Sequence, residues 1–295
     1  MATEEAARRR LAGRRLAGLF HGHPRLQVGT LLAGPVGWLV IGYLGSLAIL
    51  LIAAFWSVNA ASGELVKNLS FENFETLWNE PVYRTIVGRT VLIAALVTVT
   101  DAILAFPIAF YMAKVASRKT KAALVVAILI PLWAGYLVKV LSWRNMLSND
   151  GFINWALEPF GLHGPGYGNT AVWLVMSYLW LPYMVLPIFA GLERIPNSLI
   201  SASEDLGAKP LTTFRRVILP LCFPAVVAGS IFTFALTLGD YITPRLVSNN
   251  QFIGNVVFNN ISNNLPLASA LALVPIVVMI GYLLVARKLG AFEHI

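Results

Sequence analysis

The sequence predicts an all-α integral membrane protein with six transmembrane helices. Of its 295 residues, 57% are hydrophobic and only 12% are charged, whereas soluble domains carry about 25% charged residues. The mean hydropathy is +0.71, so the chain has too few polar residues to cover itself in water. A helix needs roughly 20 apolar residues to cross the hydrocarbon core of a bilayer, and the sequence contains six such runs.

Each predicted span is apolar on every face. A transmembrane β-barrel would instead show strands of about ten residues that alternate apolar and polar positions, so we expect helices. The predicted spans are Leu31 to Trp56, Ile86 to Ala113, Ala122 to Trp143, Ala171 to Ala190, Leu219 to Tyr241 and Leu267 to Ala286. Prolines inside three of these runs predict kinks; they are Pro107, Pro131, Pro182 and Pro187.

The distribution of basic residues predicts the orientation. With the N-terminus inside, the outside loops hold only Lys67, Arg84, Arg144 and Arg245 of the 22 Lys and Arg residues. Cytoplasmic loops of membrane proteins are enriched in Lys and Arg. We therefore expect both termini of this multi-pass chain to be cytoplasmic.

Residues 1–30 form a basic tail, predicted to be cytoplasmic and to lie against membrane lipid. Arginines beside a span are expected on topological grounds alone, so we expect no nucleic-acid partner. The first apolar run is too long for a signal peptide. His21 and His23 make no metal set, and the single Cys222 cannot form an internal disulfide. Residues 31–295 are predicted to form one six-helix domain.

Two predicted outside loops carry local signals. The loop from Ser57 to Thr85 contains SFENFETLW, whose aromatic residues at helical spacing predict a short interfacial helix. The loop from Asn145 to Thr170 contains EPFGLHGPGYGN, and its Gly and Pro residues predict a turning surface connection.

The segment between the fourth and fifth spans, about residues 193–218, differs from the other loops. Pro196-Asn197-Ser198 is a plausible helix start, Leu199 to Leu206 can form a short helix, and Gly207 can end it in a left-handed conformation. Pro210 can begin a second short helix. Such a helical elbow is more than a connection needs, so we expect a partner to bind it.

This segment resembles a known motif. SASEDLGAKPLTTFRRVILP, Ser201 to Pro220, is similar to the EAA signature of ABC importer permeases, Glu-Ala-Ala-x3-Gly-x9-Ile-x-Leu-Pro. Ala202, Gly207, Leu219 and Pro220 match in register, and Val217 stands for Ile. The motif's Glu is Ser201 here and its second Ala is Ser203, while Glu204 lies one turn after Ser201 on nearly the same face.

The resemblance implies the six-helix type I (MetI-like) fold of ABC importer permeases. It also implies that Ser198 to Pro210 form a coupling helix that docks on an ATP-hydrolysing subunit. The expected coupling residues are Ser201, Ala202, Ser203, Glu204, Asp205, Gly207 and Ala208. The expected partners are an ATP-binding subunit dimer, a homologous second permease and an extracytoplasmic substrate-binding protein, in the cytoplasmic (inner) membrane of a prokaryote.

Further segments resemble the spermidine/putrescine permeases within this class. They are FPIAFYMAK, LIPLWAGYLVKVLSWRNMLSNDGFIN, LPYMVLPIFAGLERIP and LGDYITPRLV. The resemblance implies a polyamine cargo. Ferric iron, thiamine, phosphonate and opine permeases belong to the same subfamily, and these cargoes remain alternatives.

Ionisable residues within spans are costly and therefore candidates for function. Asp101, Lys139 and Asp240 are such residues. Asp240 and nearby aromatic rings can attract protonated amines. The expected pathway residues are Trp133, Tyr136, Lys139, Trp143, Asp240 and Tyr241. Structural alternatives are a Lys139–Asp240 pair, interfacial aromatic residues, and an Asp101 that bonds Thr98 or Thr100.

The sequence excludes an ATP site of its own, because no Gly-x4-Gly-Lys-Ser/Thr loop occurs. We expect no enzyme activity and no bound cofactor in this chain, with ATP and Mg held by the partner ATPase. An ion-driven secondary transporter would show paired acids and inverted repeats. A membrane-embedded enzyme would show a His, Asp, Glu or Ser cluster within the spans. Neither pattern is clear in the sequence.

Overall fold

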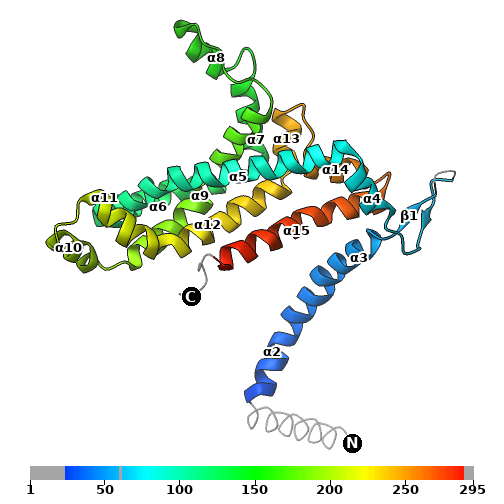
Figure 1. The fold of residues 1–295 in the computed structure, drawn as a ribbon, viewed down its shortest axis with the longest axis horizontal. Helices are drawn as coiled ribbons and strands as arrows, with labels where there is room; N and C mark the ends of the chain where they lie inside the picture. Colours follow the sequence, from blue (N-terminus) through cyan, green and yellow to red (C-terminus); the bar gives the residue numbers. More distant parts are fainter. Residues whose placement is uncertain (1–23, 60–61, 289–295) are drawn as a thin grey trace, which may run out of the picture. The chain divides into compact units, whose positions relative to one another are not determined.

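The structure is a computed structural model that describes residues 24–59 and 62–288. It is almost entirely helical (Figure 1). The chain divides into two compact units, Met1–Ala53 and Ala54–Ile295. Most of the predicted basic tail lies outside the described residues, and the first described helix begins at Pro24.

The described part of the first unit, residues 24–53, is one nearly continuous helix. It comprises α2 (Pro24–Trp38), the π-helical η1 (Leu39–Leu44) and α3 (Gly45–Ala53). Its apolar stretch of 23 residues, Leu31–Ala53, is long enough to cross a membrane. The first unit therefore supplies one candidate membrane span.

A small polar structure follows this helix. β1 (Ser57–Val58) and β2 (Leu65–Val66) form an antiparallel hairpin, and α4 (Glu72–Asn79) follows. The buried Asn73 donates two hydrogen bonds, to the carbonyl oxygens of Ala54 at 3.0 Å and Trp56 at 2.7 Å. These bonds attach α4 to the hairpin, and the predicted short helix in this loop is confirmed.

Three long helices form the core of the second unit. α5 (Pro81–Phe110), α9 (Asn169–Arg194) and α12 (Leu219–Gly239) pack against one another, and α15 (Leu265–Lys288) lies beside α12 (Figure 1). Small residues allow this close approach. A Cβ atom at Gly191 would lie 2.4 Å from the Cβ of Ala225, where α9 meets α12.

The third predicted span, in which Pro131 predicted a kink, is broken into two helices. α6 (Arg118–Trp133) and α7 (Tyr136–Leu147) meet at 89°. The ψ angles of Ala134 and Gly135 are 136° and 131°, so the backbone between the two helices is extended. Pro131, one turn before the break, removes a backbone hydrogen bond from the end of α6.

The described part of the chain therefore offers five helices that can cross a membrane, and a sixth if the bent pair is one span. The remaining elements lie between these helices. They are the π-helical η2 (Tyr111–Val115), α8 (Phe152–Leu157), the 3-10 helix η3 (Glu158–Phe160), α10 (Asn197–Asp205), α11 (Pro210–Thr213), the π-helical η4 (Phe214–Ile218), α13 (Ile242–Val247) and α14 (Ile253–Asn260).

The connection between α7 and α9 projects from the helix bundle (Figure 1). Asn154 holds it together, because its side chain donates to the carbonyl oxygens of Ser148 and Asn149 and accepts from the amide of Gly164. The predicted turning character is present at Gly161 and Gly166, whose φ angles are 66° and 60°. Helices α13 and α14 were not predicted from the sequence.

Candidate functional site

The elbow after α9 folds as its local sequence predicts. Helix α10 ends at Asp205, Leu206 follows as its C-cap, and Gly207 adopts the left-handed conformation with φ 78°. The amide of Gly207 donates to the Glu204 carbonyl at 2.8 Å, and the amide of Ala208 donates to the Ser203 carbonyl at 3.1 Å. This is the Schellman arrangement that satisfies the last carbonyls of a helix. It gives α10 a fixed end.

Contacts with α11 hold α10 as one rigid piece. The hydroxyl groups of Ser203 and Thr213 lie 2.9 Å apart, and Thr213 is buried. A groove of about 500 Å³ runs between α10 and η4, with Ala202, Leu206 and Arg216 among its lining residues. The side chain of Leu206 is 88% exposed.

The expected coupling residues are accessible on this elbow. Ser201, Ala202, Glu204, Asp205 and Gly207 are exposed, whereas Ser203 and Ala208 are half-buried. Ser201 and Glu204 are three residues apart on α10, so the carboxylate of Glu204 lies on the same side of the helix as Ser201.

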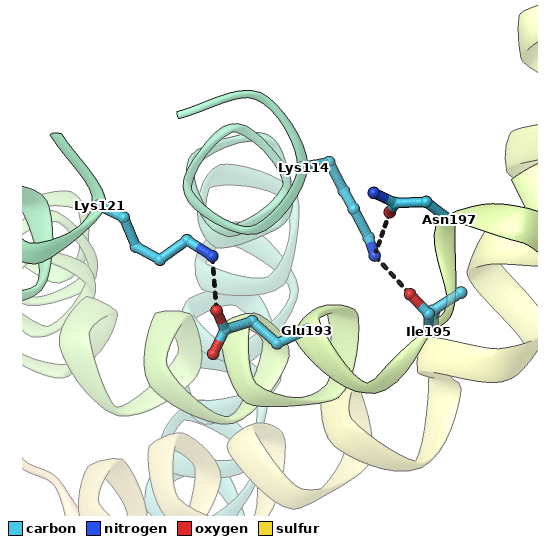
Figure 2. Close-up of polar contacts among 5 residues, drawn as sticks. All are labelled: Lys114, Lys121, Glu193, Ile195 and Asn197. Atoms are coloured by element: carbon cyan, nitrogen blue, oxygen red, sulfur yellow. Dashed lines mark hydrogen bonds and ion pairs between the residues drawn. The ribbon is translucent and has the colours of Figure 1, made fainter. Parts of the chain in front are cut away.

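Two lysines hold the elbow from neighbouring elements (Figure 2). The ammonium group of Lys114, in η2, donates to the carbonyl oxygen of Ile195 at 2.6 Å and to Oδ1 of Asn197 at 3.2 Å. Ile195 directly follows α9, and Asn197 is the first residue of α10. A single ammonium group thus bridges the junction between α9 and α10.

Lys121, in the first turn of α6, makes the second attachment. Its ammonium group lies 2.6 Å from Oε1 of Glu193 and 5.8 Å from the centre of the Phe189 ring, both on α9. The two charged side chains are 30% and 42% exposed, so the ion pair contributes less than about 1 kcal/mol. Its role is to set position rather than to supply stability.

At the other end of α12, Asp240 joins two helix breaks. Its Oδ2 accepts hydrogen bonds from the hydroxyl groups of Tyr136 at 2.5 Å and Thr243 at 2.6 Å. Its Oδ1 accepts from the backbone amides of Ile242 at 2.9 Å and Thr243 at 3.2 Å. Tyr136 begins α7, immediately after the break in the third span. The carboxylate therefore fixes the start of α13 to the start of α7.

Aromatic rings surround these two breaks. Tyr136 stacks on Trp180 of α9 with ring centres 6.0 Å apart. Tyr241 stacks on Phe258 of α14 at 4.8 Å, and the guanidinium of Arg245 lies 5.1 Å from the centre of the Phe258 ring. The Phe258 ring, which stacks on the expected pathway residue Tyr241, thus already contacts the guanidinium group of Arg245.

The other expected pathway residues are more dispersed. Trp133 is 91% exposed, and the ring centres of Trp143 and Tyr178 of α9 lie 5.5 Å apart. Lys139 is half-buried on α7, and it is not among the hydrogen-bond or ion-pair partners of Asp240 within residues 24–59 and 62–288. The structure therefore brings Tyr136 together with Asp240 but not with Trp133.

Asp101 lies in the middle of α5 and is 0% exposed. Neither of its carboxyl oxygens has a hydrogen-bond partner in the described structure. The hydroxyl of Thr98 donates to the carbonyl of Ala94, and the hydroxyl of Thr100 accepts from Nε1 of Trp173. The expected bond from Asp101 to one of these threonines is therefore absent.

The Lys114 and Lys121 contacts were missed by the sequence argument, which counted both residues only as topological charges. Their partners lie 81 and 72 residues further along the chain, and no local sequence pattern predicts contacts between residues so far apart. A search for clusters of at least three His, Cys, Asp or Glu side chains suited to a metal ion finds none in the described part of the chain.

Comparison with known proteins gives consistent matches. A model of the family described as binding-protein-dependent transport system inner membrane component matches residues 38–290. The chain is 42% identical over 297 residues to the inner membrane ABC transporter permease protein YdcU of Escherichia coli K12, with 95% of each chain covered. It is 28% identical over 233 residues to the spermidine/putrescine transport system permease protein PotB of Haemophilus influenzae, covering 76% of this chain and 81% of the relative.

A solved structure shares the fold. It is a bacterial alginate ABC transporter in complex with an alginate pentasaccharide-bound periplasmic protein. The TM-score is 0.71 with 15% sequence identity, over 92% of this chain and 96% of the matched chain.

Proposed function

The chain belongs to the family of binding-protein-dependent transport system inner membrane components and is a permease subunit of an ABC importer, and on this premise we propose that its cargo is a polyamine such as spermidine or putrescine. The predicted type I permease fold is confirmed. The protein is a multi-pass inner-membrane transport component rather than an enzyme. Family membership also removes the ion-driven secondary transporter that the sequence left open.

The polyamine cargo is supported by one observation above others. The chain is 28% identical over three quarters of its length to a relative named as a spermidine/putrescine permease. The half-buried carboxylate and aromatic rings at Tyr136, Asp240 and Tyr241 suit protonated amines in chemical type. Ferric iron, thiamine, phosphonate and opines are the competing cargoes.

Importers of this class work with an ATPase and a binding protein outside the membrane. In our proposal α10 docks on the ATP-binding subunit dimer, which holds ATP and Mg, and this chain binds no cofactor itself. The support is a rigid, exposed helix with a fixed end and an adjacent groove. The closing of the ATPases on ATP then moves α10.

A homologous second permease is proposed to complete the pathway. The support is that the described residues offer at most six spans and one docking helix, α10, whereas the proposed ATP-binding partner is a dimer. We also propose that the elbow end and both termini lie in the cytoplasm; the support is the number of Lys and Arg residues in these segments.

The test is purification of the tagged chain in mild detergent, identification of its partners by mass, and ATPase measurement in lipid vesicles. We expect an ATPase subunit and a second permease to co-purify. The binding protein with spermidine or putrescine should raise ATP hydrolysis and drive uptake of the labelled polyamine. Stimulation by thiamine, ferric iron, a phosphonate or an opine instead would overturn the polyamine cargo while leaving the importer in place.

A further inference from the structure

The hinge between α9 and α10 has few restraints of its own. Ile195 and Pro196 both have extended backbone, with ψ angles of 117° and 139°. Helix α9 ends at Arg194 and α10 begins at Asn197, so no helical hydrogen bond crosses the hinge. Two extended residues between helices leave the angle between them to be set by other contacts.

Lys114 makes a polar contact that spans this hinge (Figure 2), in addition to the apolar packing of Ile200 on the core cluster that includes Leu192 and Ile195. Its ammonium group donates to the Ile195 carbonyl on one side and to the Asn197 side chain on the other. Ile195 is buried in the core and cannot follow a movement of α10. A rotation of α10 about the hinge must therefore break one of the two bonds or carry Lys114 with it.

Lys114 belongs to a different span from the hinge. It lies in η2, which continues α5, and the turn after it leads to Lys121 in α6. Lys121 in turn contacts Glu193 in the last turn of α9. The turn between the second and third spans, residues 114–121, is thus attached at two points to the end of the fourth span.

Irregular helix occurs on both sides of this attachment. η2 precedes the turn and η4 follows the elbow, and both are π-helical. Phe106 of α5 and Phe214 of η4 pack edge to face at 5.2 Å. Wide π turns are frequent at functional sites, and here they lie where a displaced α10 would have to be accommodated by its neighbours.

We propose that Lys114, supported by Lys121, is a positioning residue that fixes the angle of α10 and passes its displacement to the second and third spans. This inference rests on the proposed docking of α10 on an ATPase. In this role Lys114 links ATP hydrolysis to opening of the pathway, without contact to ATP or cargo. Loss of the link leaves ATP hydrolysis running with less transport for each ATP.

The first test compares variants of the assembled complex with its binding protein in vesicles. Lys114→Met keeps the length and apolar stem but removes the ammonium group, and Lys114→Arg keeps a donor. Lys119→Met is the matched control, since Lys119 is an exposed lysine of the same turn with no hydrogen bond or ion pair in the described structure. Asn197→Ala removes one of the two acceptors and covers the case in which Lys114→Met fails to assemble.

We expect Lys114→Met to lower spermidine uptake per ATP hydrolysed by roughly threefold to tenfold, as loss of charged hydrogen bonds implies. Asn197→Ala should lower it less, Lys114→Arg should restore part of it, and Lys119→Met should leave it unchanged. Equal uptake per ATP in Lys114→Met and wild type would overturn the proposal. A wild-type complex without stimulated ATPase activity would refute the proposed function instead.

A second measurement does not depend on the cargo. A spin label placed by Ser201→Cys on exposed α10, in the full chain with Cys222→Ser, reports the motion of this helix by its spectral line shape. We expect a more mobile label in Lys114→Met and an unchanged one in Lys119→Met. An unchanged line shape in Lys114→Met would show that Lys114 does not hold α10, whatever the complex transports.

Discussion

The two ends of α12 are held in opposite ways. At the α10 end, Lys114 bridges a hinge of two extended residues and most expected contact residues are exposed. At the α13 end, Asp240 accepts four hydrogen bonds and joins two helix breaks. Few contacts at a hinge permit movement, whereas a fully bonded carboxylate resists it. The first end is suited to receive a force and the second to keep its shape.

The largest expected effect comes from the close packing of α9 against α12 at Gly191. Gly191→Ala places a methyl group 2.4 Å from the Cβ of Ala225 and pushes α9 away from α12. Overpacking of this kind costs about 1–3 kcal/mol. We expect a lower thermal unfolding temperature and less assembled complex. Gly281→Ala is the matched control, because a Cβ at Gly281 meets nothing within 4 Å; equal losses in both variants would contradict this account.

The α13 end gives the next largest effect and separates two roles for Asp240. Asp240→Ala leaves the hydroxyl groups of Tyr136 and Thr243, which lie 2.7 Å apart, with only each other as partners, and it removes the acceptor of two backbone amides, at a cost of about 1–3 kcal/mol. Asp240→Asn keeps one oxygen for the two backbone amides, and its NH2 group can donate to the hydroxyl groups of Tyr136 and Thr243, so it should lose less stability than Asp240→Ala in thermal unfolding. Asp150→Asn, at an exposed loop position, is the control.

Transport by Asp240→Asn then decides between structure and pathway. Normal polyamine uptake by Asp240→Asn at unchanged expression would refute the hypothesis that the charge of Asp240 attracts the cargo. Lost uptake with retained stability would support that idea and would make the α13 end part of the pathway as well as a rigid joint.

A smaller effect is expected where α10 ends. Gly207 has φ 78°, a conformation that costs other residues about 1–2 kcal/mol. Gly207→Ala should loosen the end of α10 and weaken binding of the ATPase subunit, measured by titration of the purified partners. Gly239→Ala, where a Cβ has open space and φ is not positive, is the comparison. Unchanged affinity in Gly207→Ala would separate the left-handed cap from docking.

The smallest expected effect is at Asp101, a buried residue of α5. Asp101→Asn preserves shape and removes a carboxyl that has no hydrogen-bond partner within the described residues. Because a buried carboxyl group without hydrogen-bond partners gains no compensating interaction, we expect no fall in thermal stability. We also expect unchanged uptake, since a fully buried side chain does not line a pathway in this conformation. A strong loss of uptake at normal stability would assign Asp101 a transport role.

The sequence was most informative where structure is determined locally. The start of α10 after Pro196, the left-handed Gly207 and the second helix starting at Pro210 follow from the backbone preferences of proline and glycine, and all three were predicted. The six apolar runs were recognisable because a bilayer requires a minimum length.

Features that depend on distant contacts were not predictable. The 89° break in the third span combines a proline, which the sequence shows, with a bond from Tyr136 to Asp240, 104 residues away. The sequence around Lys114 does not predict its two hydrogen-bond acceptors at the hinge between α9 and α10. Short helices such as α13 depend on similar tertiary contacts rather than on a long apolar pattern.

The central claim, that α10 is the surface through which ATP hydrolysis acts, is tested most directly by site-specific cross-linking in intact membranes. A photoreactive residue at the exposed Leu206 is compared with one at the exposed Leu92 in the middle of α5. The account predicts a cross-link from Leu206 to an ATP-binding subunit that changes when ATP is added, and none from Leu92. Cross-links from Leu206 to lipid alone, or equal ATPase cross-links from both positions, would contradict it.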